Sequence, residues 1–299
     1  MARRKTYRVM GLLFDLYRII VHVLGCLFEG STHYNRMRVP PDRKLHLLAN
    51  GPSLGIFLNN MEKNPFVDDH CDYIAINDFI TDERCLKIKP KYYVLSDPMF
   101  LYDTKQRERG DRVMQGLANK VDWDMTLFVR FNTKDSPLLP ILAKNSHIKI
   151  EHYHSYNYPI DSELGGIRRW LFKHGMGNGE YSTVAINAIY LGITLGYKQI
   201  YLHGVDHTFF NGLMVNDDNI PCYVYKHSFD TSEVAKQIAW HYDDSRDYKN
   251  MPYFLFETYR IFKGHWIMAD YANYVGTKIF NCTEGSLIDA YPRIKTEFN

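Results

Sequence analysis

The 299-residue sequence predicts an α/β fold in which helices cover both faces of a mostly parallel β-sheet. Two observations lead to this class. From residue 44 onward, short apolar runs alternate with helical patterns, and this alternation is the order that builds a parallel sheet. In addition, the apolar runs 44–49 and 199–204 both end in small polar turns, as buried parallel strands do where they deliver a loop to a ligand.

Residues 1–43 precede this alternation and are expected to form a separate unit, an amphipathic helix followed by a polar linker. The helix is predicted over residues 8–28, where the less apolar residues recur in steps of three and four and so share one narrow stripe. These residues are Arg8, Gly11, Asp15, Arg18, His22 and Gly25. Asp15 and Arg18 interrupt the apolar run too early for a transmembrane span.

The charge distribution points to what this helix contacts. Residues 1–50 contain nine Lys and Arg and three acids, which gives this segment a net charge of +6. Because the whole chain has a net charge of +2, residues 51–299 carry a net charge of −4. An apolar helix preceded by basic residues is expected to lie in the plane of a membrane surface. Docking on the protein's own body or on a partner is the alternative. The near-neutral total argues against nucleic acid as a ligand.

The five cysteines are scattered, without CxxC pairing or regular spacing. They are Cys26, Cys71, Cys85, Cys222 and Cys282. This usage favours a reducing compartment and argues against both a disulfide framework and a zinc site.

Residues 44–299 are expected to form one nucleotide-binding domain. The predicted strands are 44–49, 73–77, 92–96, 125–130, 147–153, 199–204 and 277–281. The predicted helices are 54–61, 105–119, 182–195 and parts of 231–275. The stretch 207–252 is polar and aromatic with little periodicity, and because it follows a strand end it is expected to be a lid over the site.

The turn Asn50-Gly51-Pro52-Ser53 is the strongest local motif. Gly51 allows a close approach of the backbone to a ligand, Ser53 can cap the following helix, and free N–H groups at that helix start favour a phosphate. The turn lacks the Gly-Lys-Ser/Thr ending of a phosphate-binding loop and the GxGxxG of a dinucleotide site. The alternative is an ordinary strand–turn–helix corner.

Two further sets of residues extend this site. Asn77 and Asp97 each stand at the end of a predicted strand, and with Asn50 they would converge on one crevice, where they can bind ribose hydroxyls and base edges. The glycine-rich segment 175–179 leads to Ser182 and Thr183 at a helix start, which is a second candidate anion site. Taken singly, each of these residues is more typical of a turn or a helix cap.

Histidines supply the candidate general bases, because their protonation changes near neutral pH. The candidates are His203, His207, His227, His241 and His265. No HExxH or similar metal-binding signature accompanies them, so no metal ligand is assigned.

Three segments of the sequence resemble a known family. They are the turn 50–54, the strand and turn 195–206, and the tail 278–287. All three look like bacterial sialyltransferases of glycosyltransferase family 42. They look equally like related proteins of polysaccharide gene clusters, a group that includes 6-hydroxymethylpterin diphosphokinase-like proteins. The resemblance spans about residues 44–292 and leaves the N-terminal helix uncovered.

The resemblance implies a Rossmann-like (GT-A-like) domain, a CMP-activated sugar donor, a closing lid, and inversion without an essential metal or other cofactor. The residues that would hold the donor nucleotide are Asn50, Gly51, Pro52, Ser53, Asn77, Asp97, Ser182, Thr183, Gly204, Asp206, Tyr223 and Tyr225. Of these, Asp97 falls where the family has asparagine. Tyr223 and Tyr225 stand in for phosphate-binding tyrosines that have no direct counterpart here.

The catalytic histidine of that family matches Tyr259 in this chain, so the base is assigned elsewhere: to His227 first, then His265, then His207. The resulting hypothesis is a bacterial glycosyltransferase that moves a sialic acid-like sugar from a CMP-sugar to a surface glycan such as lipopolysaccharide. We expect it to be cytoplasmic, peripheral on the inner face of the cell membrane, and to use a glycan or lipid-linked acceptor. Its oligomeric state stays open, and a homo-oligomer is compatible with the sequence.

Two other functions remain as alternatives. One is a Mg²⁺-dependent pterin pyrophosphokinase that uses ATP, against which the membrane-like helix argues, because a soluble pterin needs no surface. The other is a non-catalytic scaffold in glycan assembly.

Overall fold

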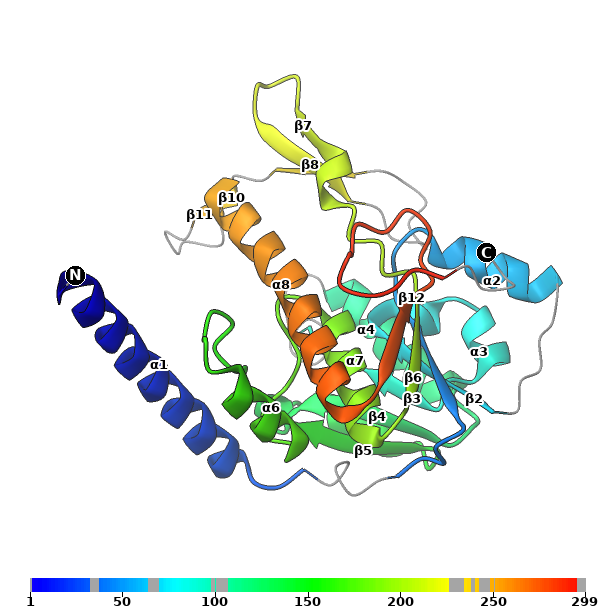
Figure 1. The fold of residues 1–299 in the computed structure, drawn as a ribbon. Coiled ribbons are helices and arrows are strands. Elements are labelled where there is room, and N and C mark those ends of the chain that lie inside the picture. Colours follow the sequence, from blue (N-terminus) through cyan, green and yellow to red (C-terminus); the bar gives the residue numbers. More distant parts are fainter. Residues whose placement is uncertain are drawn as a thin grey trace.

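The computed structural model describes residues 2–32, 38–63, 70–97, 100, 107–225, 234–237, 240–241, 248–249 and 251–294. Seven strands form its central sheet in the order β12-β6-β1-β2-β3-β4-β5, and every neighbouring pair is parallel (Figure 1). The strands are β1 (Lys44–Leu48), β2 (Cys71–Ile76), β3 (Tyr92–Val94), β4 (Met125–Arg130), β5 (Ile148–Tyr153), β6 (Gln199–His203) and β12 (Lys278–Asn281). The predicted α/β class with a parallel sheet is therefore confirmed.

The strand order reverses beside β1. From β1 the chain builds β2 to β5 outward on one side, and then returns to place β6 and β12 on the other side. Leu48 at the end of β1 thus lies opposite both Ala75 of β2 and His203 of β6. Because the connections leave this point in opposite directions, a crevice opens beyond the carboxyl ends of the strands, where α/β proteins commonly bind ligands.

Helices cover both faces of the sheet. They are α2 (Leu54–Lys63), α3 (Arg84–Ile88), α4 (Arg107–Lys120), α5 (Leu139–Leu142), α6 (Gly165–Lys173), α7 (Val184–Leu195) and α8 (Met251–Val275), with 3-10 turns η2 (Asn77–Thr81), η4 (Phe131–Thr133) and η5 (Phe209–Gly212). Leu47 packs among the residues of α7 and α8, whereas the next residue, Leu48, packs among those of α2 and α4. This alternation, with period two, places one core on each face.

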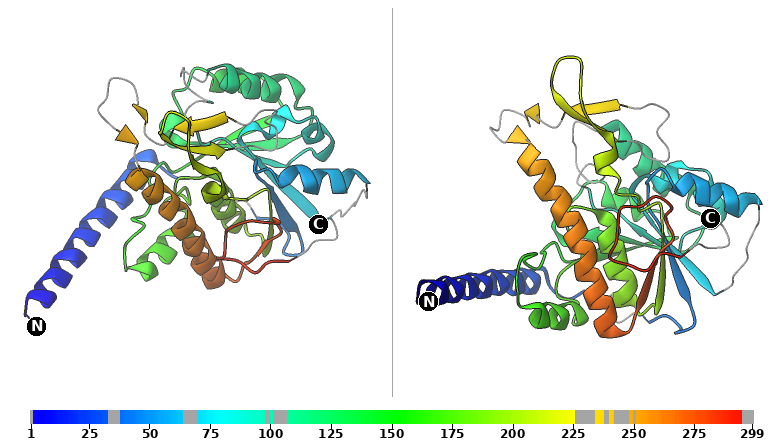
Figure 2. Two further views of the ribbon diagram at one scale, coloured as in Figure 1. Left: turned by 90° about the horizontal axis from the view of Figure 1, so that it is seen from above. Right: turned by 45° about the horizontal axis from the view of Figure 1, so that its top comes forward.

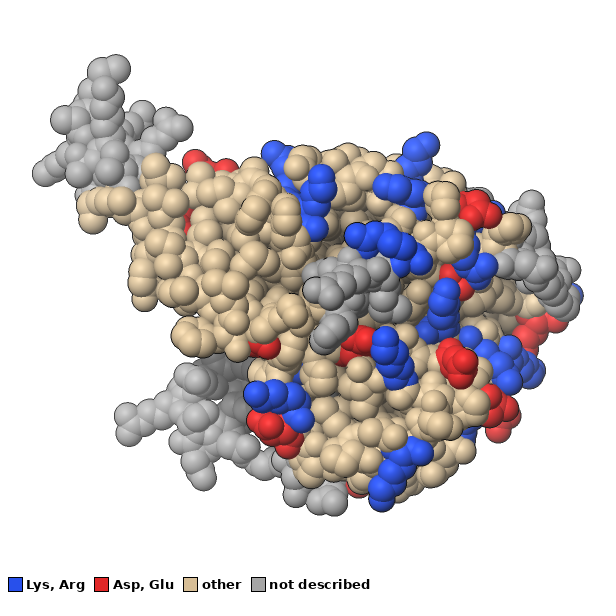
Figure 3. Space-filling model, turned by 90° about the horizontal axis from the view of Figure 1, so that it is seen from below, with Lys and Arg blue, Asp and Glu red and all other residues tan. Residues whose placement is uncertain are grey.

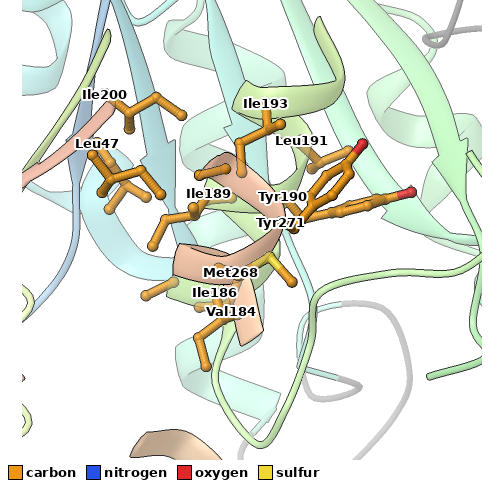
Figure 4. Packing of buried hydrophobic residues seen from close by; sticks show 14 of the residues in the cluster. Leu47, Val184, Ile186, Ile189, Tyr190, Leu191, Ile193, Ile200, Met268 and Tyr271 are labelled. Carbon is orange, nitrogen blue, oxygen red and sulfur yellow. The ribbon is translucent and has the colours of Figure 1, made fainter. Parts of the chain in front are cut away.

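Helix α7 is the centre of the larger core. Its residues are almost all buried, and Ile186, Ile189 and Tyr190 lie between the sheet and Met268 and Tyr271 of α8 (Figure 4). A helix that is apolar on all sides is stable in water only when both faces are covered. The start of α7 is therefore held firmly by the core.

The segment after β6, about residues 207–252 and here called the insertion, has secondary structure of its own. Strands β7 (Leu213–Val215), β8 (Pro221–Tyr225) and β9 (Val234–Gln237) form an antiparallel sheet, and β10 (Trp240–His241) pairs with β11 (Tyr248–Lys249). Gly212 lies so close to the backbone of Val224 that a side chain there would clash. This small sheet projects from the main domain beside the amino end of α8 (Figure 1).

The N-terminal helix α1 (Ala2–Glu29) begins earlier than predicted, and the part near its carboxyl end packs on the protein's own body. Ile19, His22 and Cys26 are buried. Gly25 lies against the ring of Tyr156, where a Cβ would come within 2.5 Å of ring carbon Cζ. The Glu29 carboxylate accepts a hydrogen bond from the Ser155 amide at 3.0 Å.

The orientation of α1 is unusual for a protein in water. Its polar stripe, which continues from Asp15 through Arg18 and His22, faces the body, and most of its apolar residues face outward. The exposed apolar residues are Met10, Leu12, Leu13, Phe14, Leu16, Tyr17, Ile20, Val21, Leu24, Leu27 and Phe28. By length and composition, Met10–Glu29 is long and apolar enough to cross a membrane, contrary to the expectation that Asp15 and Arg18 interrupt the run too early. The helix projects from the domain (Figure 2), and the face in Figure 3 has few charges at that end.

Candidate functional site

A cavity of about 500 Å³ lies at the point where the strand order reverses. Its walls come from the ends of β1, β2 and β6, the start of α7, and the insertion. The lining residues are Ala49, Asn50, Gly51, Pro52, Ile76, Asn77, Thr183, Val184, Ala185, Gly204, Val205, Asp206, His207, Thr208, Asn211, Gly212, Leu213, Met214 and Val224. The size is that of a typical small-molecule site.

Two turns are packed against each other at the floor of this cavity. The Gly51 amide donates to the carbonyl of Gly204 at 2.9 Å. Gly204 has a φ of +69°, and a Cβ on it would lie 2.7 Å from the Ala49 carbonyl oxygen. A Cβ on Gly51 would collide with the carboxylate of Asp206. Gly51 and Gly204 therefore both leave no room for a Cβ, and Gly204 also has a backbone conformation that favours glycine.

Asp206 occupies the start of α2. The Ser53 hydroxyl donates to Asp206 Oδ2 at 2.8 Å, and the Ser53 amide donates to Oδ1 at 3.2 Å. The Ser53 amide and hydroxyl, which were expected to be available to a phosphate, are therefore used by the chain's own carboxylate. Burial raises the pKa of Asp206, and the two bonds from Ser53 oppose that rise.

Two side-chain amides in the cavity are incompletely satisfied. Asn50, at the end of β1, is 7% exposed, and Asn77 follows the adjacent strand β2 with a φ of +47°. Among the described residues, neither Asn50 Oδ1 nor Asn77 Oδ1 has a hydrogen-bond partner, although both atoms are buried. An unpaired buried polar atom costs about 1–3 kcal/mol, so such atoms indicate that a ligand completes the site.

The start of α7 forms another wall. Thr183 is its N-cap, and Thr183 Oγ1 accepts from the Ala185 amide at 3.4 Å. Thr183, Val184 and Ala185 all line the cavity, so the positive end of a buried helix dipole faces it. Ser182 was predicted as the first residue of this helix but lies two residues before α7, with a φ of +60°, and its hydroxyl donates to Glu257 of α8.

The structure brings together two of the candidate histidines. His207 Nε2 lies 3.0 Å from His265 Nε2, and His265 Nδ1 lies 3.0 Å from the Tyr291 hydroxyl. His207 lines the cavity, whereas His265 on α8 is completely buried and cannot touch a ligand there. Burial lowers the pKa of His207 to about 3, and burial together with the neighbouring His207 lowers the pKa of His265.

His207, His265 and Tyr291 form a hydrogen-bonded chain, here called the histidine row. Because both imidazoles are neutral at pH 7, the protons of this row can be arranged in two ways. In one, His207 Nε2 donates to His265 Nε2 and His265 Nδ1 donates to the Tyr291 oxygen, which leaves His207 Nδ1 as a free acceptor. In the other, Tyr291 donates inward and every bond is reversed. In the first arrangement His207 Nδ1 can therefore accept a proton while His207 Nε2 keeps its bond to His265. Tyr291 could not be found from sequence, because it lies 26 residues beyond His265 with no motif around it.

A partly buried ionic cluster holds the approach to α7. Arg130 Nε donates to Glu180 Oε2 at 3.0 Å, and the Ser96 and Tyr153 hydroxyls also donate to that carboxylate. Ser96, Arg130 and Tyr153 come from the ends of β3, β4 and β5, so Glu180 ties three strands to the glycine-rich segment that leads into Thr183. No motif around Glu180 indicates this role.

Two further predicted residues, Asp97 and Tyr223, do not line the cavity. Asp97 is exposed and is not among the residues that line the cavity, while Tyr223 packs against Phe254 with ring centroids 5.6 Å apart. The side chain of Tyr225 and the whole of His227 lie outside the described residues.

Of the two other candidate bases, His203 is buried against Phe57 and does not line the cavity, and the side chain of His241 lies outside the described residues. In the described part of the chain, no group of three or more His, Cys, Asp or Glu residues is placed to hold a metal ion.

Comparison with known proteins is limited to solved structures. No family model matches the chain, and no curated protein sequence matches it. It is similar to the sialyltransferase CstII from Campylobacter jejuni in complex with the substrate analogue CMP-3FNeuAc, at 13% identity and a TM-score of 0.42, over 86% of this chain and 88% of that one. A second CstII structure, with cytidine-5'-monophosphate, gives 13% identity and a TM-score of 0.37, over 84% of each chain. The function is therefore inferred from the cavity itself.

Proposed function

We propose that the chain is a glycosyltransferase that moves a sialic acid-like sugar from a CMP-sugar to a surface-glycan acceptor, with inversion and without an essential metal. One observation carries the proposal: a single cavity combines two unpaired buried amide oxygens, the start of a buried helix, and a histidine row. The sequence motifs of the turn at residues 50–54 and the segment 195–206 agree with it.

Each wall of the cavity suits one part of such a donor. The oxygens of Asn50 and Asn77 accept hydrogen bonds, which the amino group of cytosine and the ribose hydroxyls can donate. The phosphate fits the start of α7, where helix amides and the dipole favour an anion. Because Asp206 already fills the start of α2, the start of α7 is the position that we assign to the phosphate.

In the proposed step, the acceptor hydroxyl oxygen bonds to the anomeric carbon of the sugar. The bond from that carbon to the phosphate oxygen breaks, and CMP leaves with the electron pair. The proton of the acceptor passes to His207, and the bond to His265 holds the ring in place. The anionic phosphate of a bound donor favours protonated His207, so donor binding raises a pKa that is low in the free protein, and the second charge that forms as CMP leaves favours it further.

The acceptor and location follow from α1. We propose that its outward apolar face enters the headgroup region on the cytoplasmic side of the membrane, beside a lipid-linked glycan acceptor. Arg3, Arg4, Lys5 and Arg8 precede that face in sequence and suit anionic lipids. In this arrangement residues 1–43 act as the anchor and residues 44–299 as the catalytic domain, with the insertion at about 207–252 as its lid.

The test is a thermal-shift panel with CMP, CDP, UDP, GDP and ATP, each with and without Mg²⁺. CMP alone is expected to raise the melting temperature, because a ligand that binds only the folded state stabilises it. Asn50→Ala and Asn77→Ala should reduce that shift, whereas Asn273→Ala, an exposed asparagine on α8, should leave it unchanged. Stabilisation by ATP only with Mg²⁺ would indicate the pyrophosphokinase, and no response to any nucleotide would indicate the scaffold.

A further inference from the structure

A second cavity, of about 360 Å³, lies between α8 and the segment that leads into α6. Its lining residues are Ile160, Asp161, Ser162, Glu163, Gly165, Arg168, Tyr259, Lys263, Trp266, Ile267 and Asp270. None of these residues lines the first cavity. Helix α8 contributes to both sites, since His265 contacts His207 of the first cavity and the next residue, Trp266, lines the second.

Two aromatic rings stand in the wall of this second cavity. Tyr259 is 46% exposed and Trp266 is 51% exposed. They are seven residues apart on one helix, which places them about 10 Å apart along its axis and on the same side. Large aromatic surfaces left in water at a cavity are a common feature of binding sites.

Both rings are held in place by their polar ends. The Tyr259 hydroxyl donates to Asp161 Oδ1 at 2.9 Å, and Trp266 Nε1 donates to Asp289 Oδ1 at 3.1 Å. The bond to Asp161 raises the pKa of Tyr259, so its hydroxyl remains a donor. Rings that are fixed before binding lose little conformational entropy when a ligand stacks on them.

The polar groups of the cavity have mixed charge. Asp161, Glu163 and Asp270 are acidic, and Arg168 and Lys263 are basic. Arg168 is 8% exposed, its terminal nitrogen lies 3.1 Å from Asp270, and its Nε has no hydrogen-bond partner among the described residues. With both signs interspersed, the cavity does not select a phosphate or a polycation. It offers donors and acceptors to a neutral polar ligand.

We infer that this second cavity is a binding site for a neutral oligosaccharide. Sugar rings present C–H faces that stack on aromatic rings, while their hydroxyls both donate and accept hydrogen bonds. Tyr259 and Trp266 supply two stacking faces, and the carboxylates with Arg168 and Lys263 supply the partners for hydroxyls. This inference does not rest on the donor proposed for the first cavity, because binding here requires no nucleotide.

The test is saturation-transfer NMR and titration calorimetry on the full chain, without nucleotide, with lactose, maltose and chitobiose as probes. At least one disaccharide should bind, and Tyr259→Ala and Trp266→Ala should each weaken that binding at least about tenfold, equivalent to about 1.4 kcal/mol. Trp170→Ala is the matched control, since Trp170 on α6 is 53% exposed and does not line the cavity. The Trp170→Ala variant should bind the disaccharide with the same affinity as the parent protein.

Two results would overturn the inference. One is that none of the three disaccharides binds to folded protein. The other is that Tyr259→Ala and Trp266→Ala, with melting temperatures like that of Trp170→Ala, bind as the parent does. CMP binding is measured separately on the same samples, so a failure at the nucleotide cavity is distinguished from a failure here.

Discussion

Replacing Gly51 with alanine tests the packing of the two turns at the floor of the nucleotide cavity. The new Cβ would lie 2.5 Å from the Gly204 carbonyl oxygen and still closer to the Asp206 carboxylate. Neither neighbour is the free end of a flexible side chain, because Gly204 O is backbone and Asp206 is held by Ser53. The turns must separate, and the two bonds between Ser53 and Asp206 are lost.

The magnitude follows from those bonds. Hydrogen bonds to a charged group contribute about 1.5–3 kcal/mol each, and partial relaxation recovers some of this. We therefore expect Gly51→Ala to lower the free energy of unfolding by about 2–4 kcal/mol, measured by urea denaturation. We also expect loss of the thermal shift with CMP, because the floor of the cavity moves.

Gly55, the second residue of α2, is the matched control. A Cβ there meets nothing within 4 Å, and alanine is favoured over glycine inside a helix by about 0.8–1 kcal/mol. Gly55→Ala should therefore be neutral or slightly stabilising and should keep CMP binding. If Gly51→Ala and Gly55→Ala unfold at the same urea concentration, the contact between the two turns does not hold the site as described.

Two further predictions concern the histidine row and α1. The pKa of His207 in the folded protein, about 3, lies below the usual 6.5. The stability that neutral His207 contributes is therefore complete above pH 6.5 and is lost as the pH falls toward 3. Between pH 7 and pH 5, the free energy of unfolding should fall by about 2 kcal/mol because of His207. Urea titrations should show a smaller loss in His207→Gln, and equal losses in parent and variant would refute the assignment. For α1, Leu13→Glu and Phe14→Glu should each reduce co-sedimentation with phosphatidylglycerol vesicles severalfold. The control is Ile56→Glu, at an exposed apolar residue of α2, which should leave vesicle binding unchanged. Unchanged vesicle binding in all three variants would show that α1 is not the membrane contact.

Much of the fold could be predicted because the signals are local. The period of apolar residues and the turn residues located all seven strands of the main sheet within about two residues of their observed ends. The same signals placed Asn50 and Asn77 at adjacent strand ends, and these residues do line one cavity. Thr183 was expected inside a helix and instead caps it, a shift of two residues at a boundary.

The period of apolar residues and the turn residues could not predict what each residue of the site contacts. Asp206 bonds to Ser53 across 153 residues of sequence, and this contact decides that the start of α2 is filled. His207 meets His265 across 58 residues, and only their approach indicates which histidine faces the cavity. Contacts of this kind depend on how whole elements pack, which the pattern along one segment does not encode.

The sequence by itself determined the parallel sheet, the cavity-forming turns and the amphipathic nature of residues 8–28, because each depends on periodicity and backbone preferences within one segment. Only the tertiary structure decided that the polar stripe of α1 faces the body and its apolar side faces outward. The stripe continues to Glu29, whose carboxylate contacts His154 and the Ser155 amide. An amphipathic pattern specifies that two faces differ, and the partner available to each face decides which one is covered.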